Sequence, residues 1–417
     1  MLRVGYDIRG IYGEDIDEEL AYRVGLRVGG AGNVIVGHDA RRGSVSLYRA
    51  VVDGVIDAGG SALAAGLVTT PVLVYAAKGL ATDAAVMVTA SHNPPEYNGF
   101  KLFGRDGLPL SMDQMRSFWR SLDAVDRKEG GTLARVDAWG LYADALSRRF
   151  PRTDASILLD SGNGVGALYG DVLRRFVRVV HVRPDIHPGF PDRGPEPTHD
   201  RVSDLVDLLR NGAADLAIAT DGDGDRVVIV DEQGVIPSYQ LLHAFYRALG
   251  GPVVASIDIP PMFLPNGENV YRAPVGTSNI VSMALDVGAR FSAEMSGHFT
   301  AYDFSYSSDP IYFGLLALQT EVLRPEIPRI PHVTKSYRIS DPGAAMSRLR
   351  SSFPVVSEID GVELSVDGHW VLVRPSNTEP KLRVSVAGPE PRKVLGILER
   401  VIFSGVRTSL ASQGAPA

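Results

Sequence analysis

The chain has 417 residues, which corresponds to two to four domains at about 100–200 residues per domain. Its 45% apolar and 22% charged residues are typical of a globular protein, and the absence of cysteine excludes disulfides and thiolate metal sites. The net charge of −7 argues against nucleic acid as the main partner, since phosphate backbones are bound by basic faces. The first ten residues lack the apolar run of a signal peptide, and no stretch approaches about 18 uncharged apolar residues. We therefore expect a cytoplasmic protein with no membrane span and no membrane partner.

The predicted elements alternate between strands and helices through most of the chain. This alternation favours α/β layers with a substantially parallel sheet. Three prolines within 324–331 mark a linker, and a small α+β domain is predicted beyond it. In chain order, strands are predicted at 34–37, 84–89, 157–160, 216–220, 227–231, 363–366, 370–373 and 382–386, and helices at 46–58, from the turn after 160 to about 175, and at 202–209 and 391–401.

The first loop that carries chemistry follows the predicted strand 84–89 and reads Ala-Ser-His-Asn-Pro-Pro-Glu-Tyr-Asn-Gly-Phe-Lys over residues 90–101. A serine at the end of a buried strand, in a turn with two prolines, is expected to be exposed and rigid. That setting suits a hydroxyl that accepts and donates a phosphoryl group, so Ser91 is a candidate for this function. Lys101, on the same loop, is a proton carrier if its pKa is lowered. Alone, such a Ser/Asn/Pro turn is more often only structural.

Three aspartates alternate with glycines in the loop Thr-Asp-Gly-Asp-Gly-Asp-Arg at 220–226. Carboxylates at this spacing can converge on one hard cation such as Mg²⁺, which also keeps a phosphate oxygen as a ligand. An EF-hand is the rival interpretation, because three aspartates and Glu232 fall at loop positions 1, 3, 5 and 12. It is disfavoured because Arg226 stands where the EF-hand needs glycine, and because both flanks are predicted strands rather than helices.

Two further polar loops lie in the second half of the chain. In Glu-Met-Ser-Gly-His at 294–298, the glutamate and serine can hydrogen-bond sugar hydroxyls, and the histidine can exchange a proton near neutral pH. The loop at 373–383 combines two arginines, a lysine, two hydroxyls and an amide, which match a dianionic phosphate. Each of these loops, taken alone, is more simply a polar turn. The Gly-rich residues 160–166 have the wrong spacing for a dinucleotide fingerprint and predict a tight strand-to-helix turn.

In order and rough spacing, the four loops resemble the active-site loops of the α-D-phosphohexomutase superfamily. Tyr-Asp-Ile-Arg-Gly at 6–10 matches that family's N-terminal signature, so the resemblance spans nearly the whole chain. It implies four domains around a deep central cleft, each of which contributes one loop. Three similar mixed-sheet α/β domains are expected at 1–130, 131–237 and 238–327, and a smaller α+β domain is expected at 328–417.

The resemblance also implies roles for individual residues. Ser91 would be the phosphoserine and would complete a site for one Mg²⁺ ion with Asp221, Asp223 and Asp225. The residues implied to stabilise the transferring phosphoryl group or to move protons are Arg9, Lys101, Arg226 and His298, and which of Lys101 and His298 is acid or base is left open. The residues implied to bind the sugar and the non-reacting phosphate are Glu294, Ser296, Arg374, Ser376, Asn377, Thr378 and Arg383.

The implied activity is reversible transfer of phosphate between O1 and O6 of a hexose monophosphate, through phosphoserine and a hexose 1,6-bisphosphate that is also the activator. The Glu-Met-Ser-Gly-His loop favours glucose and mannose phosphates, with glucosamine phosphate as the alternative. Pro274 and Thr277 stand where bacterial phosphomannomutase/phosphoglucomutases tend to have lysine and histidine, so substrate phosphate is expected to be held less there. The expected partners are small sugar phosphates, and the protein is expected to be a monomer or homodimer.

Two functions of other classes remain open. A metal-dependent sugar phosphatase would also use Ser91 as nucleophile, but it would release free phosphate. A non-catalytic binding protein is disfavoured, because binding alone needs neither an intact Ser91 nor three intact aspartates.

Overall fold

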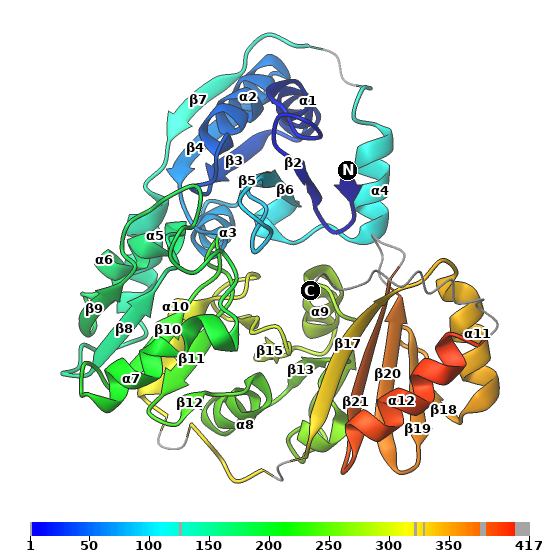
Figure 1. Cartoon of the computed structure of the whole chain (residues 1–417). Helices are drawn as coiled ribbons and strands as arrows, with labels where there is room; N and C mark the ends of the chain where they lie inside the picture. Colours follow the sequence, from blue (N-terminus) through cyan, green and yellow to red (C-terminus); the bar gives the residue numbers. More distant parts are fainter. Residues whose placement is uncertain (1, 125–126, 321–322, 328–329, 376–380, 405–417) are drawn as a thin grey trace, which may run out of the picture. The chain divides into compact units, whose positions relative to one another are not determined.

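The computed structural model describes residues 2–124, 127–320, 323–327, 330–375 and 381–404 (Figure 1). The chain divides into two compact units, Met1–Ile327 and Pro328–Ala417. Three sheets lie in the first unit and one lies in the second. The residue ranges of the four domains expected from the sequence stay predictions.

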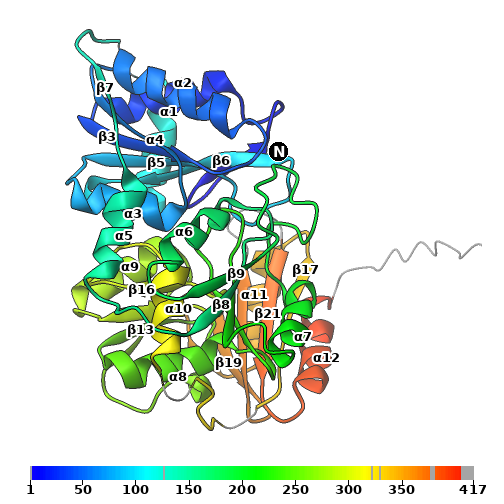
Figure 2. The ribbon, with the colours of Figure 1, turned by 90° about the vertical axis from the view of Figure 1, so that its left-hand side faces the viewer.

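The first sheet has seven strands in the order β1-β2-β6-β5-β3-β4-β7. β3 pairs in parallel with β4 and β5, whereas β6 is antiparallel to both β5 and β2. Helices α1 and α2 cover one face of this sheet, and α3 lies on the other (Figure 2). The strands are β1 Arg3–Val4, β2 Ile8–Ile11, β3 Asn33–His38, β4 Ser61–Leu67, β5 Ala84–Val88, β6 Tyr97–Phe103 and β7 Thr132–Arg135; the helices are α1 Glu18–Gly29, α2 Ser44–Asp57, α3 Thr70–Gly79 and α4 Met112–Arg120.

The start of α1 illustrates how local sequence sets these elements. The side chain of Asp17 caps the helix by accepting the backbone N–H of Leu20, and two glutamates lie in the first turn, at the positive end of the helix dipole. Leu20, Val24 and Val28 recur every four residues and bury one face of α1 in the core of the first sheet.

The second sheet has the strand order β12-β11-β10-β8-β9. β10 is parallel to β8 and antiparallel to β11, so the three aspartates lie in the connection between two neighbouring strands, as the sequence predicts. The strands are β8 Ser156–Asp160, β9 Arg178–Val182, β10 Leu216–Ala219, β11 Val228–Asp231 and β12 Gly234–Val235; the helices are α5 Ala138–Ser147, α6 Tyr169–Leu173 and α7 Asp204–Arg210.

The third sheet has the strand order β14-β13-β15-β16. β13 is parallel to both β14 and β15, and the turn from β15 into the antiparallel β16 holds residues 294–298. The strands are β13 Val253–Ser256, β14 Val270–Ala273, β15 Phe291–Ala293 and β16 Phe299–Ala301; the helices are α8 Ser238–Leu249, α9 Thr277–Asp286 and α10 Pro310–Leu318.

A buried aspartate links α10 to the second sheet's helix α5. Asp309 caps α10 by accepting the backbone N–H groups of Ile311 and Tyr312, and it also accepts the hydroxyl of Tyr142 on α5 at 2.7 Å. Burial raises the pKa of Asp309 to about 6, although these hydrogen bonds oppose the shift.

This raised pKa predicts a pH-dependent contribution to stability. An unfolded aspartate has a pKa of about 3.9, so the folded chain holds the Asp309 proton more tightly. The contribution of Asp309 to the unfolding free energy is therefore full below about pH 4 and is lost as pH rises through about 6. In Asp309→Asn this dependence disappears. Thermal unfolding of both proteins between about pH 4.5 and 7.5 should show wild type losing stability relative to the variant as pH rises, and parallel curves would contradict the raised pKa.

The second unit contains one antiparallel sheet in the order β17-β21-β20-β19-β18. The three predicted strands and the last predicted helix are confirmed, and the sequence analysis missed β17, β18 and α11. The strands are β17 His332–Arg338, β18 Val355–Ser357, β19 Val362–Val366, β20 His369–Pro375 and β21 Lys381–Ala387; the helices are α11 Pro342–Ser352 and α12 Pro391–Ile402.

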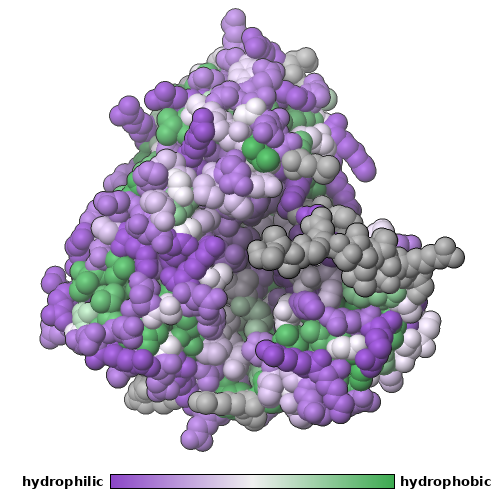
Figure 3. All heavy atoms as spheres, viewed as in Figure 1, coloured by the Kyte–Doolittle hydropathy of each residue, from purple (hydrophilic) through white to green (hydrophobic). Residues whose placement is uncertain are grey.

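Among the described residues, no helix has the length and apolar character that a bilayer crossing requires. The described atoms on the face drawn in Figure 3 are mostly hydrophilic, with small hydrophobic patches scattered among them.

Candidate active site

Ser91 lies just beyond the carboxyl end of β5. Its backbone N–H donates to Thr89 Oγ1 at 2.8 Å, and its φ of 51° lies in the left-handed region that few residues other than glycine adopt. Its hydroxyl donates to Asp221 Oδ2 at 2.9 Å, across 130 residues of sequence. The prediction of an exposed serine is wrong: Ser91 is only 3% exposed, because the acidic loop packs against it. Ser91 and the acidic loop therefore share one site.

The close approach of these two loops depends on Gly222. A β-carbon at this position would lie 2.5 Å from the carbonyl oxygen of Ser91, which is too close for any other residue. The acidic loop is also tied to the start of α3. The backbone N–H of Thr70 donates to the carbonyl of Asp223 at 3.0 Å, and its hydroxyl donates to Asp223 Oδ2 at 2.5 Å. Thr70 was not predicted as a site residue, because a threonine before Pro71 has only the features of a helix start.

Arg41 is a buried cation that hydrogen-bonds the Ser91 loop, and it was not predicted as a site residue. Arg41 is 3% exposed and pairs with Asp39 at 3.2 Å. Asp39 in turn accepts the hydroxyl of Thr89 at 2.7 Å, and Thr89 accepts the backbone N–H of Ser91. Asp39 and Arg41 follow the predicted strand 34–37, and this charged pair next to a buried strand is the sequence signal that could have identified them. The guanidinium donates to the backbone carbonyls of Ser91 (2.5 Å), Asn93 (2.7 Å), Pro94 (2.8 Å) and Tyr97 (3.1 Å).

Replacing Arg41 by lysine should therefore disturb the loop while keeping the charge. An ammonium has three donors on a point and cannot span the carbonyls that the planar guanidinium bridges. We expect kcat for the phosphate transfer that the sequence implies to fall by about tenfold to a hundredfold, with a small change in KM, because Ser91 is displaced rather than removed. Arg42→Lys, at the exposed neighbouring position, is the control. Equal kcat in the two variants, with thermal unfolding to check that both are folded, would contradict a positioning role for Arg41.

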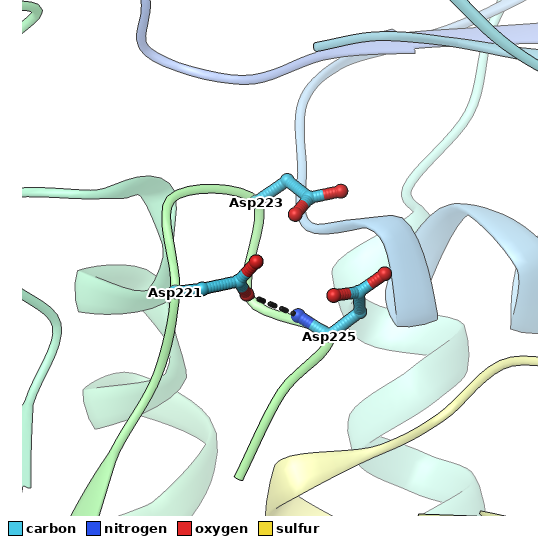
Figure 4. A group of neighbouring side chains, drawn as sticks. All are labelled: Asp221, Asp223 and Asp225. Atoms are coloured by element: carbon cyan, nitrogen blue, oxygen red, sulfur yellow. Dashed lines mark hydrogen bonds between the residues drawn. The ribbon is translucent and has the colours of Figure 1, made fainter. Parts of the chain in front are cut away.

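The three aspartates of the acidic loop point toward a shared space (Figure 4). One carboxylate oxygen from each lies within 4.8 Å of the others, and all three residues are buried. Asp221 Oδ1 accepts the backbone N–H groups of Asp225 at 3.0 Å and Arg226 at 3.2 Å, which shapes the loop. Considering only the described residues, Asp223 Oδ1 is buried without a hydrogen-bond partner. Converging buried carboxylates with an unsatisfied oxygen fit a hard divalent cation with oxygen ligands.

Lys101 faces these aspartates from the first sheet. The prediction that it lies on the Ser91 loop is wrong, because Lys101 lies within β6 and pairs opposite Met87 of β5. Its Nζ lies 2.6 Å from Asp223 Oδ2 and 2.6 Å from Asp225 Oδ2. Burial lowers the pKa of Lys101, but the charges of these aspartates outweigh burial and raise it above its usual value. Lys101 is thus a fixed positive charge here, without the lowered pKa that a proton carrier needs.

The aspartates differ in their electrostatic surroundings. Burial, and then the charges of Asp225 and Asp223, raise the pKa of Asp221 above its usual range. Burial also opposes ionisation of Asp225, but Lys101 and His298 outweigh it and lower the pKa of Asp225 well below its usual value. The repulsion felt by Asp221 is the kind that a bound divalent cation relieves.

Two arginines flank Ser91. Arg9, on β2, donates to the carbonyl of Ala90 at 3.0 Å and to Asn93 Oδ1 at 2.7 Å, so it braces the loop on both sides of Ser91. Its other nitrogens pair with Asp7.

Arg226 contacts the Ser91 loop at the residue that follows Ser91. Its guanidinium contacts His92 Nδ1 at 2.7 Å and Glu196 Oε1 at 3.2 Å. Burial, and then the charge of Arg226, lower the pKa of His92 to about 2, so the imidazole is neutral and can accept this hydrogen bond. The sequence analysis gave no role to His92 or Glu196, which together orient Arg226.

The turn between β15 and β16 brings its three predicted residues toward the acidic loop. His298 Nε2 lies 3.3 Å from Asp225 Oδ1, and His298 Nδ1 is hydrogen-bonded to Ser296 Oγ at 2.7 Å. Burial lowers the pKa of His298, but Asp225 outweighs burial and raises it above its usual value. Glu294 is 8% exposed, and its Oε1 lies 3.9 Å from His298 Nδ1.

In the second unit, two predicted phosphate ligands face each other. Arg374 on β20 pairs directly opposite Arg383 on β21, so both side chains belong to one face of the sheet. Arg374 Nε also lies 2.7 Å from Asp360 Oδ2, while Arg383 is exposed. The other predicted ligands, Ser376, Asn377 and Thr378, lie outside the described residues.

Four domain models of one protein family match successive segments of the chain. Models of the phosphoglucomutase/phosphomannomutase α/β/α domains I, II and III match residues 2–129, 141–234 and 231–324, and that of the C-terminal domain matches 340–402. The chain belongs to the phosphoglucomutase/phosphomannomutase family. The expected relationship to the α-D-phosphohexomutase superfamily is confirmed, as are the three mixed-sheet α/β domains and the smaller last domain.

Related proteins align with nearly the whole of this chain. A chain from Methanothermobacter thermautotrophicus is 33% identical over 94% of this chain and 95% of its own length. One from Methanopyrus kandleri is 34% identical over 91% of this chain and 92% of its own length. Both bear the name "Probable phosphoglucosamine mutase".

Solved structures of the family have the same fold. A phosphoglucomutase/phosphomannomutase family protein from Burkholderia thailandensis superposes with a TM-score of 0.82 at 25% identity, covering 96% of both chains. The open form of the Paramecium phosphoglucomutase pp63/parafusin gives 0.69 at 16% identity, covering 92% of this chain and 91% of its own. The second likeness supports the fold alone.

Proposed function

We propose that this phosphohexomutase is a phosphoglucosamine mutase. It would move phosphate between O6 and O1 of glucosamine through a phosphoserine at Ser91 and a 1,6-bisphosphate. The observation that carries the proposal is the hydrogen bond of 2.9 Å between the Ser91 hydroxyl and Asp221, which places a nucleophile at a cluster of acids. Such a pairing suits a group that alternately carries and releases a phosphoryl group.

Phosphoryl transfer requires alignment and neutralisation of charge more than covalent assistance. In the forward step, the bond from phosphorus to Ser91 Oγ breaks as a bond forms to the free sugar hydroxyl, whose proton passes to a protein base. The base returns that proton to Ser91 Oγ, and the bisphosphate turns end for end. In the second step Ser91 Oγ loses its proton to the base and bonds to the other phosphorus, while the bond from that phosphorus to its sugar oxygen breaks and this oxygen takes up the proton. Three positive charges would stabilise the phosphoryl group, because each is held close to Ser91 or to the acidic loop: Lys101, Arg9 and Arg226.

The sequence left open whether Lys101 or His298 transfers the proton, and His298 is the better candidate. Lys101 is fixed between two carboxylates at 2.6 Å each, whereas His298 links the sugar loop to Asp225. An imidazole paired with one carboxylate changes protonation near neutral pH more readily than a lysine paired with two.

Magnesium fits the acidic loop. Asp221, Asp223 and Asp225, with Ser91 or its phosphate, would hold one Mg²⁺ ion, because their oxygens converge and Asp223 Oδ1 has no hydrogen-bond partner among the described residues. When bound, the ion supplies positive charge to the phosphate oxygens.

The choice of sugar departs from the preference for glucose and mannose expected from the sequence. Glu-Met-Ser-Gly-His occurs in related forms in several kinds of mutase and does not separate them. Two relatives that match more than nine-tenths of the chain are named as phosphoglucosamine mutases, which supports the glucosamine alternative.

An assay with three substrates tests the proposal. Glucosamine, glucose and mannose 1-phosphates are each supplied with Mg²⁺ and a catalytic amount of the matching bisphosphate, and the 6-phosphates are measured. The proposal predicts the highest kcat/KM with glucosamine 1-phosphate. A preference for glucose or mannose would refute the sugar assignment, and release of inorganic phosphate as fast as isomerisation would favour a phosphatase.

A further inference from the structure

The glycine-rich loop at residues 160–166, to which the proposed function gives no role, packs directly against the acidic loop. A β-carbon at Gly166 would overlap the side-chain oxygen of Thr220, the residue that begins the acidic loop. A β-carbon at Gly162 would overlap the guanidinium of Arg193. Glycine at these positions therefore leaves room for Arg193 and for the start of the acidic loop.

Arg193 is a fully buried charge that joins the ends of two neighbouring parallel strands. Its Nε lies 2.9 Å from Asp160 Oδ2, and Asp160 is the last residue of β8. Its Nη2 donates to the backbone carbonyl of Thr220 at 2.7 Å, directly after the end of β10. The planar guanidinium thus connects a buried carboxylate to the backbone of the acidic loop.

The hydrogen bond from this guanidinium bears on the first aspartate of the loop. A peptide unit is planar, so the carbonyl of Thr220 and the nitrogen of Asp221 turn together. The N–H of Thr220 also donates to the carbonyl of Asp160 at 3.0 Å, so the backbone is held on both sides of Thr220. Asp221 uses one oxygen for Ser91 and the other for the N–H of Asp225 (Figure 4). Rotation of the Thr220–Asp221 peptide would therefore misdirect a carboxylate of the metal site.

The segment that carries Arg193 is tied to the glycine-rich loop by Asn163. The side chain of Asn163 accepts the backbone N–H of Asp192 at 3.1 Å and donates to the Asp192 carboxylate at 2.9 Å. The carbonyl of Asn163 accepts the backbone N–H of His187 at 2.9 Å. The φ of Asn163 is 65°, in the left-handed region that asparagine tolerates better than most side chains. Arg193 is thus placed by its neighbour in the chain as well as by Asp160.

We propose that Arg193 is a positioning residue for the metal site: it fixes the peptide between Thr220 and Asp221 and so holds Asp221 in the direction that Mg²⁺ binding requires. The inference rests on the proposed function only for the presence of Mg²⁺ at the acidic loop. Arg193 acts through the loop backbone, because its side chain has no exposed area with which to meet a substrate.

Arg193→Lys tests this assignment. An ammonium keeps the positive charge beside Asp160, but it lacks the planar fork that reaches the carboxylate and the Thr220 carbonyl together. We expect the Kd of Mg²⁺, measured by calorimetry without sugar, to rise by about tenfold to a hundredfold. At a fixed low Mg²⁺ concentration kcat should fall, and excess Mg²⁺ should restore part of it, while KM for the sugar phosphate changes by less than about threefold.

Arg183→Lys is the matched control. Arg183 pairs with the same carboxylate, Asp160, at 2.8 Å, and its other ion pair among the described residues is with Asp204. This replacement should therefore leave the Mg²⁺ Kd and kcat unchanged, even if it lowers the temperature of unfolding. Equal changes in Mg²⁺ binding in the two lysine variants would mean that the charges around Asp160 serve stability alone, and they would overturn the inference.

Asn163→Gly is a second and milder variant. Glycine adopts the left-handed backbone at position 163 without strain, so this change removes the side-chain ties to Asp192 and keeps the turn. Loosening the segment of Arg193 should raise the Mg²⁺ Kd by about threefold to tenfold. If thermal unfolding shows that Arg193→Lys does not fold, a wild-type Kd in folded Asn163→Gly would overturn the inference.

The outcomes separate this inference from the proposed function. If wild type binds Mg²⁺ and folded Arg193→Lys binds it equally well, only the role of Arg193 is overturned. If wild type binds no Mg²⁺, the metal site of the proposed function fails and the inference fails with it. A preference of wild type for glucose phosphate would refute the sugar assignment alone, because Mg²⁺ binding is measured without sugar.

Discussion

Ser91→Ala is expected to lower kcat for isomerisation by about a thousandfold or more, because it removes the hydroxyl that is proposed to carry the phosphoryl group between the two sugar oxygens. The loss should appear in kcat, while binding of the sugar monophosphate should persist, since the residues assigned to the sugar are untouched. Progress curves with glucosamine 1-phosphate and calorimetric binding of the same ligand measure the two effects.

Ser117→Ala is the matched control for this variant. Ser117 is exposed on α4 and contributes no side chain to the candidate site described above, so its replacement should leave kcat unchanged. If Ser91→Ala kept more than about a tenth of wild-type kcat, the phosphoserine mechanism would be untenable.

Asp223→Asn should produce the second large loss. Asp223 supplies the carboxylate oxygen without a hydrogen-bond partner among the described residues, and its other oxygen receives both Lys101 and Thr70. Removing its charge therefore weakens a metal ligand and releases the lysine. We expect kcat to fall by about a hundredfold to a thousandfold and the Mg²⁺ concentration for half-maximal activity to rise.

A Mg²⁺ titration of activity measures this effect, and calorimetric titration with Mg²⁺ alone gives a readout that does not depend on turnover. Asp207→Asn, which removes an exposed charge from α7, is the control and should behave as wild type. An unchanged Mg²⁺ requirement in Asp223→Asn would exclude Asp223 as a ligand.

Much of the fold follows from short-range sequence signals. The strands that frame Ser91 and the acidic loop are runs of buried apolar residues bounded by turn residues, and such runs identify strands without knowledge of their partners. Convergence of the three aspartates was also predictable, because they lie within one short loop.

The errors and omissions concern contacts that depend on tertiary pairing. Lys101 was placed on a loop because its segment carries two prolines and a glycine, yet antiparallel pairing with β5 makes it part of β6. Arg41 and Thr70 act on residues 50 and 153 positions away, and nothing in their local sequence reveals those partners. The exposure of Ser91 was misjudged because a separate domain supplies the loop that covers it.

The choice of sugar could not be predicted from the loop motif. The hydroxyls that Glu294 and Ser296 are proposed to bind are shared by glucose, mannose and glucosamine, so a motif defined by these two residues carries no information about C2. A residue that separates these sugars must contact the substituent at C2.

Transfer of labelled phosphate tests the central claim most directly. The protein is incubated with ³²P-labelled glucosamine 1,6-bisphosphate, the labelled residue is identified by peptide mass spectrometry, and the labelled protein is then mixed with unlabelled glucosamine 1-phosphate. We predict label on Ser91 alone, followed by its passage into sugar phosphate rather than inorganic phosphate. Label on another residue, or its loss to water at the rate of turnover, would contradict the account.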